Sequence, residues 1–196
     1  MAAQAIGVFF HSGKRKEIHG RRRSLSKPPG LAPLRAAAHI EVLHSVHGLE
    51  KADLENAAWT EIDGVTYRLL DPVTMLKAKA ANVRDIRQDD VPPRNDRAHL
   101  SIIAKCVPRY LADIKLKAEV SPDFERTAVE IFMRLYRTLQ DPKFAPTFRA
   151  EGIPPSDLLP ADLRQGLGER MAKLHAFQWP LVEKAAAARP SSRITL

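Results

Sequence analysis

The stretch WTEIDGVTYRLLDPVTMLKAKAANV, residues 59–83, contains the point at which the chain changes from strand to helix. Its first half alternates apolar and polar residues around Asp63-Gly64, a pair favoured in two-residue hairpin turns because both positions need positive φ. We therefore predict a hairpin with strands at 59–62 and 65–70. In the second half, apolar residues recur every three to four positions, which is the spacing of one helical face.

The junction between the two halves is a helix start. Aspartate is a favoured N-cap, and a proline at the first helical position lacks only an N–H that would have no partner there, so Asp71-Pro72 predicts that the helix begins at this point. The residues on its predicted apolar stripe are Val73, Leu76, Ala80, Val83 and Ile86. A helix that follows directly on a hairpin favours a mixed fold with both strands and helices.

The flanking sequence extends this pattern in both directions. Upstream, alternation predicts a strand over Ile40–Val46 that ends at Gly48. Downstream, apolar spacing predicts helices over 96–113, with a kink at Pro108, over 121–139, and over 160–177, the last resuming after Pro180 as far as Ala188; a proline-rich connector precedes that last helix. We expect an α+β fold, mostly helical overall, in which a small, mostly antiparallel sheet (strand plus hairpin) is followed by a helical bundle. The residues expected to point inward from the middle helices are Leu100, Ile103, Val107, Leu111, Phe124, Ala128, Ile131, Leu135 and Leu139.

Charge divides the chain unevenly. Seven lysines and arginines stand against one acid, Glu17, in the first 30 residues, so most of the net charge of +8 lies there. Neither helical nor strand periodicity runs through this segment, and Pro28-Pro29-Gly30 interrupts regular structure. We expect residues 1–37 to be a basic, disordered leader, 38–115 to hold the strands and first helices, and 116–196 to be a C-terminal helical region.

The composition excludes several classes of protein. Cys106 is the single cysteine, so the chain has no internal disulfide and no multi-cysteine zinc site. The histidines His39, His44 and His47 lie close in sequence, but no acid completes a familiar metal set, and we predict no metal site from them. No apolar run approaches the roughly 20 residues that cross a bilayer. We expect a cytoplasmic protein with no membrane partner.

Two segments carry a family resemblance. The first is Leu70-Asp71-Pro72-Val73-Thr74-Met75-Leu76-Lys77-Ala78-Lys79, continuing to Arg94-Asn95-Asp96-Arg97-Ala98-His99-Leu100, and the second is the strand from His39 to Leu49. Together they resemble nucleotidyltransferases of the polymerase-beta superfamily, including abortive-infection toxin relatives. In that family a strand leads into a Pro-x-x-Leu-Leu-x-x-Lys helix, and an Arg-x-x-Asp-x-x-His/Asp-Leu element follows. The resemblance covers roughly residues 38–112.

The resemblance implies a reaction whose central motif is missing here. Members of the superfamily transfer a nucleoside monophosphate from a nucleoside triphosphate, using two Mg²⁺ ions held by an Asp-x-Asp or Asp-x-Glu pair after a Gly-Ser turn. This sequence has no Gly-Ser and no Asp-x-Asp; Asp123-Phe124-Glu125 has the spacing but opens a late helix. We therefore expect a truncated, catalytically inactive remnant that begins after the family's first two strands. Magnesium and a nucleoside triphosphate would bind as cofactors only if a complete site were formed.

The resemblance also suggests individual site residues. Glu41 corresponds to the strand that carries the family's third carboxylate, and is the candidate catalytic residue, with a solvent-facing strand acid as the alternative. The candidate nucleotide- or phosphate-binding residues are Lys77, Lys79, Arg94 and Asp96. For the lysines the alternative is a solvated helix face, and for Asp96 it is a helix cap.

Two further partners follow from charge and strand pattern. The alternative function is a helical interaction module whose leader contacts RNA or an acidic partner by counterion release. The residues that would make this contact are Lys14, Arg15, Lys16, Arg21, Arg22 and Arg23. The strand Ile40–Val46 has one charge and no proline, so its unpaired edge predicts self-association.

Overall fold

The computed structural model describes residues 8–10, 41–43, 46–62, 65–89, 95–165 and 168–188. They belong to two compact units, each made of segments separated in sequence. One unit combines residues 1–45 with 57–70, and the other combines 46–56 with 71–196. Because the sheet falls in the first unit and all the helices in the second, the two are described in turn below.

The first unit is a four-stranded sheet. Its strands are β1 (Val8–Phe10), β2 (Glu41–Leu43), β3 (Ala58–Ile62) and β4 (Val65–Leu69), in the spatial order β2-β1-β4-β3. β1 and β2 are parallel, whereas β1 with β4 and β3 with β4 are antiparallel. The predicted hairpin is confirmed, because Ile62 pairs with Val65 and leaves two residues between the strands. The predicted mostly antiparallel sheet is therefore present, with one strand more than expected.

The added strand comes from the segment expected to be a disordered leader. Val8–Phe10 pairs with β2 on one side and with β4 on the other, so three leader residues lie inside the sheet. Valine and phenylalanine favour strands, and this short apolar triplet has the composition of a buried strand. The prediction was wrong at these three residues; the rest of 1–37, including every lysine and arginine proposed to contact RNA, lies outside the described residues.

The strand predicted over Ile40–Val46 is shorter in the structure. β2 covers Glu41–Leu43, and Val46 belongs to a turn in which its carbonyl accepts a hydrogen bond from Leu49 N at 3.2 Å. The turn ends the strand ahead of Gly48, because a carbonyl bonded three residues along the chain is not available to a neighbouring strand. β2 is an outer strand of the described sheet, and self-association through it stays a prediction.

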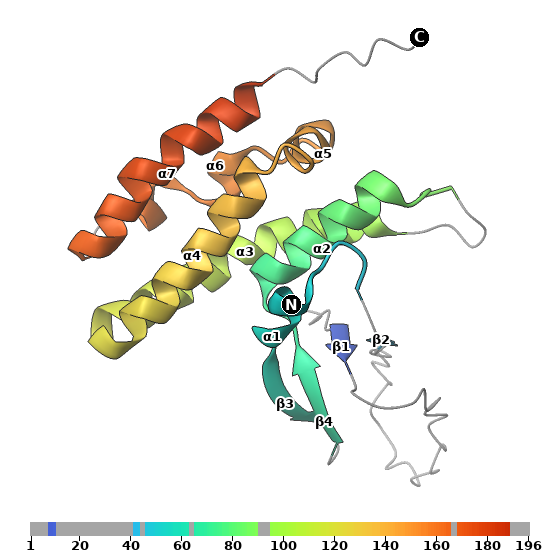
Figure 1. Ribbon diagram of the computed structural model, residues 1–196, viewed down its shortest axis with the longest axis horizontal. Helices are drawn as coiled ribbons and strands as arrows, with labels where there is room; N and C mark the ends of the chain where they lie inside the picture. Colours follow the sequence, from blue (N-terminus) through green and yellow to red (C-terminus); the bar gives the residue numbers. More distant parts are fainter. Residues whose placement is uncertain are drawn as a thin grey trace, which may run out of the picture. The chain divides into compact units, whose positions relative to one another are not determined.

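The second unit is a bundle of helices (Figure 1). Its elements are α1 (Lys51–Glu55), α2 (Pro72–Asp85), α3 (Asp96–Val120), η1 (Pro122–Phe124), α4 (Glu125–Gln140), α5 (Ala145–Ala150), α6 (Pro155–Leu158), η2 (Ala161–Arg164) and α7 (Glu169–Ala187), where η denotes a 3-10 helix. α2 packs against α3, and α4 against α7. The chain is thus mostly helical, as the sequence predicts. No helix among the described residues is both long and apolar enough to cross a membrane.

Helix α2 packs against three other helices of this unit. Its start is as predicted, with the Asp71 carboxylate accepting hydrogen bonds from Val73 N at 2.9 Å and Thr74 N at 3.1 Å. The predicted stripe is too narrow, because α2 contacts α3, α4 and α5 and is buried on several sides. Alanines at 80 and 81 are fully buried and allow this close packing. A helix surrounded by others loses the single-face pattern that a surface helix shows.

Gly48 shows how closely the chain approaches α2. Its φ is +78°, a conformation that residues with a side chain rarely adopt. A Cβ atom at this position would stand 2.1 Å from Cβ of Ala81, well inside van der Waals contact. Only glycine therefore fits here, and it fixes the path of the chain into α1.

The structure differs from the predictions at the end of α3, in the connector after α4, and at the start of α7. α3 continues through Pro108 to Val120, seven residues beyond the predicted end. The proline-rich connector contains the short helices α5 and α6, since Pro155 occupies a first-turn position that proline tolerates. The last helix begins at Glu169 and runs unbroken through Pro180, because its packing along α4 offsets the one backbone hydrogen bond that proline removes.

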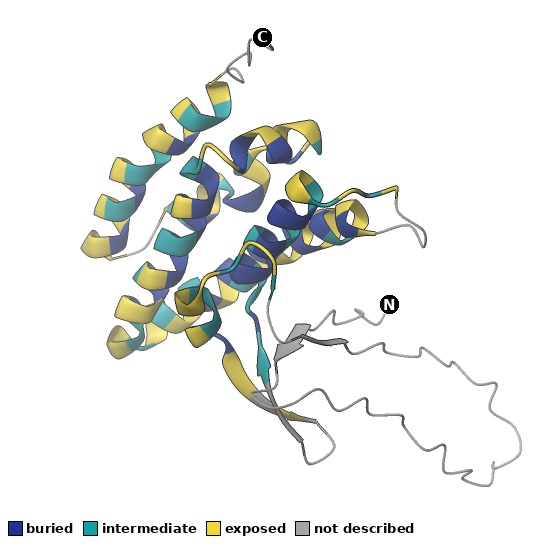
Figure 2. Cartoon of the chain, turned by 45° about the vertical axis from the view of Figure 1, so that its right-hand side comes forward, coloured by how far each residue is buried: buried dark blue, intermediate teal, exposed yellow. Residues whose placement is uncertain are grey.

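The core of the helical unit is aliphatic and follows the predicted helix faces. Leu100, Ile103, Val107 and Leu111 of α3 are buried, and so are Ala128, Ile131, Leu135 and Leu139 of α4. Figure 2 shows buried residues on the sides of the helices that face other helices and exposed residues on the outward sides. Phe124, the first residue of the predicted α4 face, is only partly buried because it belongs to η1.

Candidate functional site

A polar pocket of about 270 Å³ opens in the helical unit beside the start of α2. Its walls come from α1, α2 and α4 and from the loop after α4. The polar residues that line it are Glu50, Asp53, Thr74, Lys77, Arg134, Arg137, Thr138 and Asp141. We call it the polar pocket; three of its side chains are cationic, three are acidic, and two are threonines that offer hydroxyl groups.

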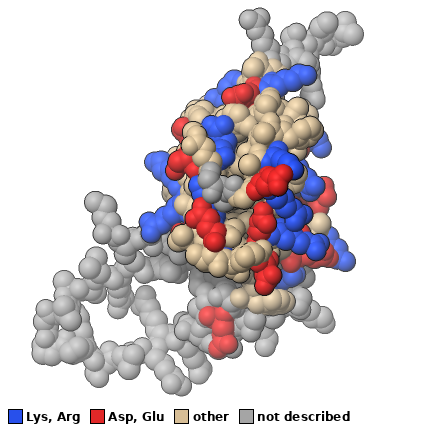
Figure 3. All heavy atoms as spheres, turned by 90° about the vertical axis from the view of Figure 1, so that its left-hand side faces the viewer, with Lys and Arg blue, Asp and Glu red and all other residues tan. Residues whose placement is uncertain are grey.

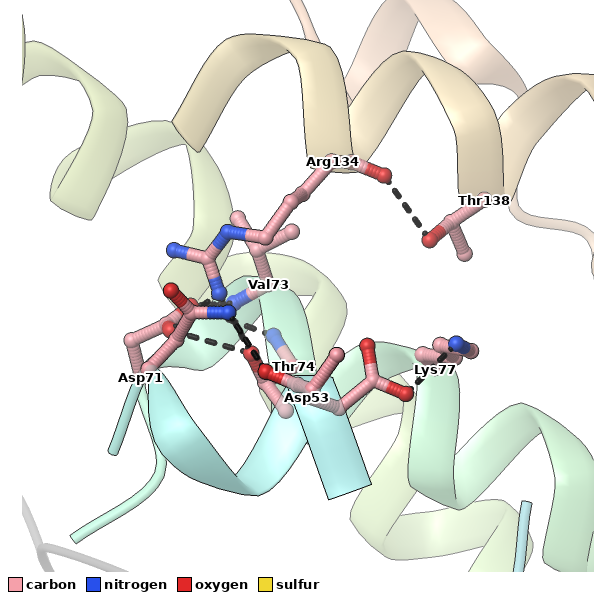
Figure 4. Close-up of polar contacts among 9 residues, drawn as sticks. Asp53, Asp71, Val73, Thr74, Lys77, Arg134 and Thr138 are labelled. Atoms are coloured by element: carbon pink, nitrogen blue, oxygen red, sulfur yellow. Dashed lines mark hydrogen bonds and ion pairs between the residues drawn. The ribbon is translucent and has the colours of Figure 1, made fainter. Parts of the chain in front are cut away.

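Arg134 lines the polar pocket and is held in place by Asp71, the residue that precedes α2 (Figure 4). Arg134 Nη1 donates to Asp71 Oδ2 and to Thr74 Oγ1, both at 2.7 Å. The same Asp71 oxygen accepts from Thr74 Oγ1 at 3.0 Å, while the other oxygen caps α2. The N-cap of α2 therefore also fixes the position of an arginine that comes from α4, about sixty residues later.

Tyr110 of α3 lies near the same pair. Burial first, and then the neighbouring Asp71 carboxylate, raises the pKa of Tyr110 to about 12. Its phenol therefore stays protonated at neutral pH and can donate a hydrogen bond. It adds no charge beside Arg134 and Asp71.

Lys77 and Asp53 form the second charged pair of the polar pocket. Lys77 Nζ donates to Asp53 Oδ2 at 2.7 Å, and the same oxygen accepts the backbone N–H of Glu50 at 2.9 Å. Figure 4 shows the two side chains pointing toward each other from α2 and α1. Both are partly solvent-accessible, with 24% of the Lys77 side chain and 17% of the Asp53 side chain exposed. Solvent therefore reaches both side chains, and a competing anion can replace the carboxylate.

Arg137 is the outermost cation of the polar pocket. It lies on α4 one helical turn after Arg134 and is exposed, and its guanidinium makes no hydrogen bond or ion pair with any described residue. Thr138, also on this face, donates its hydroxyl to the Arg134 carbonyl at 3.0 Å. Arg137 therefore offers five N–H donors at the rim of the pocket.

Lys79 lies on a different side of α2. Its Nζ donates to Asp96 Oδ1 at 3.0 Å, and Asn82 Nδ2 donates to the same oxygen at 3.1 Å. Asp96 is only 3% exposed, at the first position of α3 rather than at its cap. The structure thus joins two of the predicted site residues, Lys79 and Asp96, in a closed contact between α2 and α3, apart from Lys77.

The other predicted site residues are not placed with these. Glu41 belongs to β2 in the sheet unit, and its side chain lies outside the described residues. Arg94 also lies outside them. Of the acids with Asp-x-Glu spacing, Asp123 is exposed on η1 and Glu125 is partly buried at the start of α4. In the part of the chain that the structure describes, no group of three or more histidine, cysteine or acidic side chains is arranged to hold a metal ion.

A buried polar pair lies elsewhere in the bundle. Tyr136 OH and His175 Nδ1 are 2.7 Å apart between α4 and α7, and the Phe132 ring packs edge-on against the imidazole at 5.3 Å. Burial first, then the positive charges of Arg164 and Lys115, lowers the pKa of His175 to about 4. The imidazole is therefore neutral at pH 7 and contributes to packing.

Sequence reasoning missed Asp53, Arg134 and Arg137. The two arginines stand three positions apart on the polar side of α4, beside the predicted apolar stripe, and this spacing was visible in the sequence. Asp53 belongs to a five-residue helix, and its capping box with Glu50 is a local sequence signal for the start of a helix. No local signal indicates that these residues face Lys77.

Charge on the helical unit is mixed outside the polar pocket. Acidic and basic side chains are interspersed over the face shown in Figure 3.

Comparisons of the chain with protein-family models, with curated proteins and with solved structures gave no match. The case for a function therefore rests on the geometry of the polar pocket and on the sequence resemblance.

Proposed function

We propose that this chain is a nucleotidyltransferase-like protein that binds the phosphate groups of a nucleotide in the polar pocket without transferring them. The observation that carries the proposal is that Lys77, a residue suggested by the family resemblance, lines one pocket with Arg134 and Arg137. Two guanidinium groups and an ammonium group on adjacent helices are the donors that phosphate oxygens need.

The carboxylates of the polar pocket determine how binding occurs. Asp53 is paired with Lys77, and Asp71, which lies outside the lining, is paired with Arg134. The other two lining carboxylates, Glu50 and Asp141, form no ion pair with these cations among the described residues. The first contact of an entering phosphate is therefore with Arg137. The phosphate then displaces Asp53 from Lys77, because that pair is the more exposed of the two. Arg134 stays on Asp71 and offers its remaining N–H groups to the phosphate. Displacement of Asp53 loses the free energy of its ion pair with Lys77, so we expect modest affinity for the nucleotide.

A calorimetric titration with ATP tests the proposal. Replacing Arg137 by Ala should weaken ATP binding about tenfold to a hundredfold, the effect of one charged hydrogen bond. The matched control is Lys143→Ala, which removes an exposed cation just after α4 that does not line the pocket. Adenosine, which has no phosphate, should not bind measurably.

Two outcomes would overturn the proposal. One is ATP binding that Arg137→Ala and Lys143→Ala reduce equally, because it would indicate attraction by net charge alone. The other is transfer of labelled nucleotide to RNA or protein by the purified chain with magnesium, because the proposal includes no catalysis. Binding of RNA that is lost when Lys14, Arg15, Lys16, Arg21, Arg22 and Arg23 are replaced by glutamine, with no ATP binding, would favour the interaction-module alternative.

A further inference from the structure

A second cavity, also of about 270 Å³, lies in the helical unit between α5 and the end of α7. Its lining is mainly apolar, in contrast to that of the polar pocket, and the two share no lining residue. The side chains that matter for its chemistry are Leu139, Phe148, Ile153 and Pro154, with Arg149 and Ala186 beside them. We call it the apolar cavity.

One wall of the apolar cavity is built by the end of α5. Gly152 has a φ of +65°, and its N–H donates to the Arg149 carbonyl at 3.1 Å, while Ile153 N donates to the Phe148 carbonyl at 2.8 Å. These two hydrogen bonds define a Schellman motif, in which the residue after the glycine packs back on the last helical turn. Pro154 then restricts the chain further. The wall is therefore shaped before any ligand arrives.

The opposite wall is formed by α7, which contributes Ala186. Alanine carries a single methyl group, so it leaves space where a larger side chain would fill the gap. The cavity volume of about 270 Å³ suits a short hydrocarbon chain and is too small for a long lipid.

Among the described residues that line the apolar cavity, Arg149 alone carries a formal charge. Its Nη2 donates to the carbonyls of Ala186 and Ala188, both at 2.6 Å, at the end of α7. No described carboxylate pairs with it, whereas the nearby Glu151 pairs with Arg97 at 3.4 Å. The remaining N–H groups of this exposed guanidinium have no partner among the described residues, and a carboxylate is the group they match best.

We propose that the apolar cavity binds a small carboxylic acid with a short apolar chain. The chain lies against Phe148, Ile153 and Leu139, and the carboxylate accepts hydrogen bonds from Arg149. Burial of the chain provides most of the binding free energy, and the guanidinium selects an acid over an alcohol or an amine. The site is independent of nucleotide binding, because it uses different residues.

Calorimetric titration of the whole chain with octanoate tests this proposal, with octanol and octylamine as probes of equal chain length. Octanoate should bind at least tenfold more tightly than either. Arg149→Gln should remove that preference, and Ala186→Leu should abolish binding by filling the cavity. Arg170→Gln is the matched control, because it removes an exposed cation of α7 that does not line the cavity.

Several results would overturn the proposal. They are the absence of octanoate binding to the unaltered chain, equal binding of octanol, and octanoate binding that Arg149→Gln leaves unchanged. If Ala186→Leu does not fold, the Arg149→Gln titration still decides, since Arg149 is exposed. ATP binding is measured in the same samples, so failure of this proposal is distinguishable from failure of the polar pocket.

Discussion

Lys77 and Lys79 stand two residues apart on α2 and each bonds an aspartate, yet their surroundings differ. Two residues turn a helix by about 200°, so the side chains leave on opposite sides. Lys77 and Asp53 line an open pocket, whereas Asp96, the partner of Lys79, has only 4% of its side chain exposed and also accepts from Asn82. Burial of the acid, rather than the presence of an ion pair, therefore separates a structural contact from one that a ligand can exchange.

The largest expected effect concerns the closed contact between Lys79 and Asp96. Asp96→Ala leaves the Lys79 ammonium with no carboxylate in a mostly buried site, and removal of one partner of a buried pair costs about 3–5 kcal/mol. Urea denaturation followed by circular dichroism measures the loss. Asp89→Ala is the control, because Asp89 and its partner Arg87 are 72% and 79% exposed, and it should change the free energy of unfolding by less than about 0.5 kcal/mol. A small loss for Asp96→Ala would show that the contact is as exchangeable as the one in the polar pocket.

The second effect concerns the closed Tyr136–His175 pair. The pKa of His175 is about 4 in the folded chain, below the ordinary 6.5, so the unfolded chain binds a proton first as pH falls. Stability contributed by the neutral imidazole is present above pH 6.5 and is lost between about 6.5 and 4, by up to about 3 kcal/mol. His175→Gln keeps a hydrogen-bonding side chain without this titration.

The measurement is the free energy of unfolding of both proteins at several pH values. Carboxylates titrate in both, so the difference between the two curves isolates His175. That difference should shrink as pH falls through this range. A difference that does not vary with pH would contradict a buried neutral histidine.

A smaller effect on stability is expected for Asp71, which bonds Arg134 beside the polar pocket. Asp71→Ala removes the cap of α2 and the carboxylate bonded to Arg134, with an expected cost of about 1–2 kcal/mol. The substitution also frees Arg134, so it should tighten ATP binding while lowering stability. Parallel unfolding and titration experiments check both signs. Weaker ATP binding would indicate that Asp71 positions Arg134 for the ligand rather than competing with it.

Local patterns made part of this structure predictable. The hairpin around 63–64, the Asp71 cap and the apolar faces of α3 and α4 depend on residues close in sequence, and the structure confirms them. The place of β1 in the sheet was not predictable in this way, because its partners are 33 and about 60 residues away. A three-residue strand has too short a pattern to indicate its partners.

The candidate site shows the same limit. Its lysine lies in a segment with a recognisable motif, so Lys77 could be named from the sequence, together with Lys79 and Asp96. Which residue faces which could not, since the pairing of Lys77 with Asp53 depends on how α1 packs beside α2. The sequence resemblance therefore suggested one residue of the polar pocket, Lys77, and tertiary packing determined which other residues share the pocket with it.

The most direct test of nucleotide binding in the polar pocket replaces each lysine of α2 by methionine. ATP affinity is measured by calorimetry, and the free energy of unfolding is measured in urea. Methionine keeps the length of the side chain and removes its charge. We predict that Lys77→Met weakens ATP binding about tenfold or more and changes stability by less than about 1 kcal/mol. Lys79→Met should leave ATP affinity within about twofold and lower stability by about 3 kcal/mol. The opposite pattern, or equal effects of the two substitutions on ATP affinity, would contradict the assignment of the polar pocket.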